Sequence, residues 1–238
     1  MTAADGLAAA QEATTFDLAD AKPRELNAVL HDPSITSARY RVVNPGGRHS
    51  IAAGAVAPVR VDVEGHAGYY CAGMNQQADV HVHGNAGTGV AENMMSGTVT
   101  VDGDASQSAG ATARGGLLVI HGSASARCGI SLKGADVVVA GSVGHMSAFM
   151  AQTGRLVVCG DAGEALGDSI YEARLYVRGD VKSLGADCIE KPMRDEHVAE
   201  VAELLERAGI ENVEAASFRR YGSARRLYHF DVDNAQAY

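Results

Sequence analysis

Residues Val61–Gly84 read VDVEGHAGYYCAGMNQQADVHVHG, and the motif Val-x-Val-x-Gly that begins this stretch also ends it, 19 residues later. The same interval recurs along most of the 238-residue chain without an insertion, so one structural unit is copied and stacked. The glycines at this spacing are Gly46, Gly65, Gly84, Gly103, Gly122, Gly141, Gly160 and Gly179.

The residues before each glycine predict a short strand. Apolar residues alternate there with a period of two, as in Val61 and Val63, which is typical of a strand with one buried face. Seven residues after each glycine stands Ala or Gly, small enough for a corner where the chain turns. Because each strand pairs with its own copy in the next unit, the sheet is parallel and the chain coils. The six-residue sub-period of left-handed solenoids is absent, so the sequence predicts an all-β fold, a right-handed parallel β-helix over residues 40–191.

Two flanking regions complete the predicted organisation. Residues 1–39 form an N-terminal arm with a short helix over Pro23–Leu30, which has proline in its first turn. Residues 192–238 form a C-terminal helix and an extended tail. Helical periodicity over Asp195–Ala208 predicts an apolar face that covers an end or a side of the solenoid, made of Val198, Val201, Leu204, Leu205 and Ala208.

Composition excludes several classes of partner. The net charge of −9 argues against nucleic acid or an anionic membrane as the main partner. No apolar run reaches the length of a membrane span, and residues 1–15 lack the basic start and long apolar core of a signal peptide. Reduced thiols in a cytoplasmic protein are the simplest interpretation of four cysteines without a CxxC spacing, Cys71, Cys128, Cys159 and Cys188.

Acidic and histidine side chains stack on the outer face of the early coils. They could form a metal site or an acid/base strip, or they could be favourable neighbours on a solvated sheet. Three correctly splayed ligands are not evident, so we expect no catalytic, cofactor-binding or metal-binding residue and no stoichiometric iron, zinc or flavin. If the chain bound a metal and lost it when His81 and His83 were changed to Ala, these residues would instead be a functional site. The column is Glu64, His83, Asp102 and His121, and Asp62 and His81 point the same way.

The same outer face becomes apolar on the late coils. An apolar strip four coils long is rarely left in water, so either a flanking helix or another subunit should cover it. We therefore name its residues as candidates for a partner interface. They are Val119, Val138, Val157 and Tyr176.

The C-terminal tail combines aromatic residues with arginine, a composition that is enriched in protein interfaces. RNA binding is the alternative, but the acidic total and the lack of an RNA-binding signature disfavour it. We expect the tail to clasp another subunit and the solenoid to fold without residues after Glu211. The candidate interface residues here are Tyr221, Arg225, Tyr228 and Phe230.

A Gly-x-x-Gly-x-x-x-Gly unit repeated in a valine-rich β-helix resembles the C-terminal domain of the glutamate synthase large subunit. One copy is Gly160, Gly163 and Gly167, and another ends in Ala, with Gly65, Gly68 and Ala72. The segment Asp180–Lys191, the helix after it and the tail Arg219–Arg225 are most similar to the free-standing β-helix subunit of N-methylglutamate synthase. Ser106 and Ser125, which stand at the second glycine, depart from the motif.

The resemblance implies a subunit without an active site of its own. An amidotransferase-like subunit and a synthase subunit with FMN and an iron–sulfur cluster would carry the chemistry, which converts L-glutamate and methylamine to N-methyl-L-glutamate and ammonia. The alternative is the C-subunit scaffold of a formylmethanofuran dehydrogenase or a formyltransferase/hydrolase complex. A lone lyase or acyltransferase on a β-helix is a third class.

Overall fold

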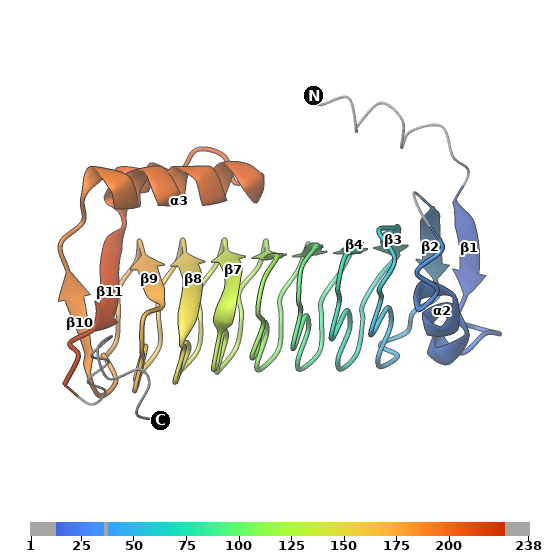
Figure 1. The fold of residues 1–238 in the computed structure, drawn as a ribbon, viewed down its shortest axis with the longest axis horizontal. Helices are drawn as coiled ribbons and strands as arrows, with labels where there is room; N and C mark the ends of the chain where they lie inside the picture. The colour runs from blue at the N-terminus through green and yellow to red at the C-terminus, as the bar shows by residue number, and fades with distance from the viewer. Residues whose placement is uncertain (1–12, 36–37, 227–238) are drawn as a thin grey trace.

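The computed structural model describes residues 13–35 and 38–226, which form a parallel β-solenoid of stacked coils (Figure 1). The right-handed winding of the solenoid stays a prediction. Nine of its strands pair side by side and in parallel. In sheet order they are β1 (Thr14–Asp17), β2 (Arg39–Val43), β3 (Arg60–Val63), β4 (Asp79–Val82), β5 (Thr98–Val101), β6 (Leu117–Ile120), β7 (Lys133–Val139), β8 (Thr153–Val158) and β9 (Arg174–Val177).

The predicted 19-residue register is confirmed from β3 to β9. Val61 pairs with Val80, and Val80 pairs with Val99. Between β2 and β3 the step is instead 21 residues, because Val42 pairs with Val63. A shift of two residues keeps the same side chains on the inner face, so Val42 remains buried in the core.

Small residues shape the corners of the coil, as the sequence predicts. Two residues after the repeat glycine, Ala67 bridges to Ala86 and Ala86 bridges to Ala105, which makes a second parallel ladder. Seven residues after it, the backbone is left-handed, with φ of 53° at Ala72 and 66° at Gly110. A Cβ on Gly110 would lie 3.1 Å from the side chain of Leu118, so a larger residue at this corner would crowd the core.

The repeat glycines themselves set the distance between coils. A Cβ on Gly122 would lie 2.7 Å from the carbonyl carbon of Gly103, and one on Gly141 would lie 2.7 Å from the carbonyl oxygen of Gly122. In the same column, the Gly122 N–H donates a 3.0 Å hydrogen bond to the Gly103 carbonyl. Backbone therefore packs directly on backbone, and no side chain fits between them.

Helix α2 (Pro23–Leu30) closes the first coil and has the bounds that the sequence predicts. Leu26 and Leu30 are buried in the core, and the Asn27 amide donates to the Ser50 carbonyl at 2.8 Å. Strand β1, which precedes the helix and pairs with β2, was not predicted.

The described part of the C-terminal tail, up to residue 226, contributes a strand to the chain's own sheet. After β9 come β10 (Cys188–Lys191), helix α3 (Asp195–Arg207), a 3₁₀ turn (Ala215–Ser217) and β11 (Arg219–Ser223). Strand β11 lies between β9 and β10, antiparallel to both (Figure 1). Tyr221 is 2% exposed and part of the core, so its assignment to a partner interface is corrected. Removing residues after Glu211 would remove this strand, and the expectation that the solenoid folds without the tail stays a prediction.

Helix α3 covers the apolar strip of the late coils. The strip residues Val119, Val138, Val157 and Tyr176 are each at most 2% exposed and pack against Val201, Leu204, Leu205, Ala208 and Phe218. The Tyr176 hydroxyl also donates to Glu200 of the helix at 2.6 Å. Of the two covers that the sequence allows, the structure has the flanking helix, so these four residues are not a free surface for a partner. His197, and not Val198, is buried on this helix.

The cysteines are free thiols, and all four are buried. Burial raises the pKa of Cys71 and of Cys128 to about 12, which keeps both protonated and unreactive. In the described part of the chain, neither helix has the length and apolar character needed to cross a membrane.

The glycine column generates a stability prediction. Gly122→Ala should lower the free energy of unfolding by about 1–3 kcal/mol, because its Cβ must push two coils apart. Gly222→Ala is the matched control, since a Cβ there has its nearest atom at 3.8 Å, and should change the stability by at most about 0.5 kcal/mol. Urea unfolding of both variants measures the difference, and equal stabilities would contradict the close contact.

The covered strip generates a second prediction. Val138→Asp should cost about 3–5 kcal/mol of unfolding free energy, because it places an unpaired charge beneath α3. Thr100→Asp is the matched control. Thr100 lies in the same column two strands earlier and is only half-buried, so this change should lower the free energy of unfolding by about 0.5 kcal/mol or less. Denaturant unfolding of the isolated chain checks both values, and a tolerated Val138→Asp would mean that the strip is not dry.

Candidate functional site

The outer face of the early coils is polar, and helix α3 does not cover it. Helix α3 extends from the end with β10 and β11 over β9, β8 and β7, and it does not reach β4 or β3 (Figure 1). On β3 to β5 the outward positions carry charged or hydroxyl side chains, whereas the corresponding positions on β6 to β8 carry Val119, Val138 and Val157. The exposed half of the solenoid is therefore where a polar site can form.

Two histidines and two aspartates meet on this face. The Nε2 atom of His81 lies 2.6 Å from Oδ1 of Asp102, and Nδ1 of His83 lies 3.1 Å from Oδ2 of the same carboxylate. The other ring nitrogen of His83 lies 3.5 Å from Oδ1 of Asp62. The two imidazole rings lie 3.9 Å apart between centroids. Strands β3, β4 and β5 thus bring together residues from three successive coils.

Arginines hold the inner carboxylate of this cluster. Asp62 is 4% exposed, and it accepts hydrogen bonds from Arg39 at 2.9 Å and from Arg60 at 3.1 Å. Burial alone would raise the pKa of Asp62, but the hydrogen bonds and charges of these arginines outweigh it and place the pKa below its usual value. Asp62 is therefore a fixed, ionised carboxylate.

Asp102 is more exposed and is charged for a different reason. Partial burial raises the pKa of Asp102. The hydrogen bonds and charge of His81, and then those of His83, lower this pKa by more than burial raises it, so it lies below its usual value. The carboxylate bridges the two imidazoles and fixes the orientation of each ring.

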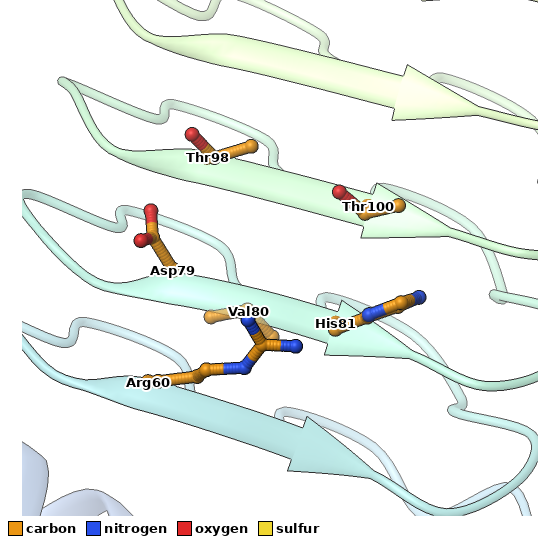
Figure 2. Close-up of a pocket in the computed structure, with 6 residues that line it drawn as sticks. All are labelled: Arg60, Asp79, Val80, His81, Thr98 and Thr100. Carbon is orange, nitrogen blue, oxygen red and sulfur yellow. The ribbon is translucent and has the colours of Figure 1, made fainter. Parts of the chain in front are cut away.

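A shallow cavity of about 170 Å³ adjoins the cluster (Figure 2). Its lining comes from β3, β4 and β5. Figure 2 shows Arg60 on β3, Asp79 and His81 on β4, and Thr98 and Thr100 on β5, with Val80 on the opposite side of the β4 ribbon. The cavity offers hydroxyl, carboxylate, imidazole and guanidinium groups in a small and open space, so it has room for a small ligand or an ion.

The remaining residues of the predicted column lie outside this cluster. Glu64 pairs with Arg41 at 2.8 Å, and His121 is exposed two coils beyond His83. In the tail, Arg225 forms a 3.0 Å ion pair with Glu172 of the same chain. Tyr228 and Phe230 lie outside the described residues, so their assignment to an interface stays a prediction.

The sequence analysis missed the arginines of the site. Arg39 and Arg60 both stand at the outward start of a strand, and their register predicts contact with the acids on the same face. The two-residue shift between β2 and β3 brings Arg39 beside Arg60, and a strict 19-residue alignment does not place it there.

A comparison with curated proteins shows which family the chain belongs to. The chain is 62% identical over 225 residues to Protein GlxC of Rhizobium meliloti (strain 1021), covering 94% of this chain and 99% of that protein. The chain belongs to the GlxC family. The GlxC match extends over the solenoid and reaches into both flanks, so the whole architecture described above falls within it. No family model matches the chain, and no solved structure matches it.

Proposed function

We propose that the chain is a non-catalytic β-helix subunit of a cytoplasmic glutamate-synthase-like complex, and specifically of an N-methylglutamate synthase. In that complex it would hold an amidotransferase-like subunit and an FMN-containing synthase subunit together. The observation that carries the proposal is the glycine-motif solenoid itself, which forms most of the chain and resembles the glutamate synthase domain. The relation to glutamate synthase and the assignment to methylamine use both rest on this resemblance.

A solenoid suits this role because its coils are paired without a break from β3 to β9. Each strand from β3 to β9 is hydrogen-bonded to the next in parallel register, and the glycine column fixes the spacing. A subunit that must keep two partners in a fixed relation needs this property. Flavin and iron–sulfur chemistry belongs, in this proposal, to the partner subunits.

The early coils supply the proposed contact with a partner. Large apolar side chains are exposed there on the turns of two successive coils, and Met74 is 56% and Met95 47% exposed. Tyr69 and Tyr70 are exposed nearby in the chain. Methionine and tyrosine are enriched in interface cores, and the late apolar strip is already occupied by α3.

Reconstitution tests the proposal. The full chain, co-expressed with an amidotransferase-like and an FMN-domain subunit encoded beside it, should form a stable complex that converts L-glutamate and methylamine to N-methyl-L-glutamate. The chain alone should show no activity. Activity from the chain alone would overturn the proposal, and assembly with a formyltransferase and an amidohydrolase instead would favour the formyl-transferring complex.

The contact itself is tested with a matched pair of variants. Met74→Glu with Met95→Glu should weaken assembly at least tenfold, because the charges must lose water at the interface. Met74→Leu with Met95→Leu keeps the apolar surface and should assemble like the wild type. Size-exclusion chromatography with mass measurement over a range of concentrations gives the affinities. Equal assembly by both double variants would place the contact elsewhere on the solenoid.

A further inference from the structure

We propose that Asp62, His81 and His83 form a binding site for one divalent transition-metal ion, with Zn²⁺ as the ion whose preferences the ligands fit best. The proposal departs from the sequence-based expectation of no metal and is independent of the proposed function. Two imidazoles and one carboxylate are a ligand set that zinc accepts, with the fourth position open to water or another ligand.

The distances between the ligand atoms fit a single ion. One ligand atom from each of the three residues lies within 4.8 Å of the other two. With metal–ligand bonds of about 2.0–2.2 Å, two ligands of a tetrahedral zinc ion lie roughly 3.3 Å apart. The 3.5 Å separation between His83 Nε2 and Asp62 Oδ1 is close to this value, so an ion between them needs little movement of either side chain.

Asp102 acts on this site as a positioning residue. Its carboxylate lies 3.1 Å from His83 Nδ1, and when that nitrogen carries the ring proton, Nε2 is left unprotonated and directed towards Asp62. A carboxylate on the far nitrogen of a ligating histidine fixes the ring and increases its basicity. The same carboxylate also bonds His81, so that one acid orients both imidazoles.

The backbone holds the ligands in place before any ion binds. Asp62, His81 and Asp102 stand on or directly after strands that are paired in strict 19-residue register, with Asp62 beside His81. Asp62 is further fixed by Arg39, which donates to Oδ2 and leaves Oδ1 facing His83. A site on paired strands loses little conformational freedom when it binds a metal.

Arg60 competes with the ion for the same oxygen. Its guanidinium lies 3.1 Å from Asp62 Oδ1, and its side chain is half exposed, so it can turn away into water. A metal ion at the site must displace this contact. The geometry therefore gives a distinctive expectation: removing the Arg60 charge should strengthen metal binding, whereas removing a ligand should weaken it.

The test is a metal titration of the full chain, without a polyhistidine tag and stripped of metal by a chelator. Co²⁺ added alone should give the visible absorption of a four-coordinate site, saturating at one ion per chain, and Zn²⁺ should displace it. Excess Zn²⁺ should also raise the melting temperature, because the ion binds the folded chain. No saturable binding near one equivalent would overturn the proposal and leave the cluster as an ion-pair network on the sheet.

Single substitutions test which residues bind the ion. His81→Ala and His83→Ala should each weaken Co²⁺ and Zn²⁺ binding at least tenfold, and Asp102→Asn should weaken it by about 10–100-fold. Arg60→Gln should strengthen it. His121→Ala is the matched control, because it removes an exposed imidazole from the same column without touching the cluster, and binding should not change. Circular dichroism of each variant reports whether it is folded. Unchanged binding by the two ligand variants, or loss of binding by His121→Ala, would show that the ion is not held here.

Discussion

The contact of one glycine backbone on another is the constraint on which this structure depends. Between Gly103 and Gly122 the coils approach until a single methyl group no longer fits, and the backbone hydrogen bond along the column requires that approach. The paired strands, the stacked valines and the alanine ladder all follow at the same spacing. On the outer face, side chains at equivalent positions of successive coils therefore lie next to one another in columns. The chemistry of each column depends on which residue each coil has at that position.

Much of the solenoid could be predicted because its interactions repeat at one interval in the sequence. Val61, Val80 and Val99 pair as their spacing indicates, and the predicted small corner residues Ala72 and Gly110 have left-handed backbone. The first coil departs from the 19-residue spacing, because Val42 lies beside Val63. An alignment at a strict 19-residue period does not reveal this offset of two residues. The winding sense follows from packing around the whole coil rather than from any one residue, and it stays a prediction.

The flanks were harder to predict because their partners lie far away in the chain. The helix over Pro23–Leu30 follows from local signals, and its bounds agree with the structure. The position of Tyr221 could not be predicted in this way. A segment rich in aromatic residues and arginine is equally suited to a subunit interface and to a strand at the edge of the chain's own sheet. For the candidate site, the 19-residue register predicts that His83 and Asp102 are neighbours. It does not predict the contact of Arg39 with Asp62, because that contact depends on the offset of the first coil.

The glycine column also restricts how this molecule can vary in length. A closely packed backbone ladder cannot be stretched or compressed by small amounts, so the separation between the polar early coils and the helix-covered late coils changes only by the gain or loss of an entire coil. Each such change moves the two regions by about 4.8 Å along the axis. Homologous solenoids should therefore differ in length by whole multiples of this step, and any protein that spans both regions must match one of a discrete set of distances.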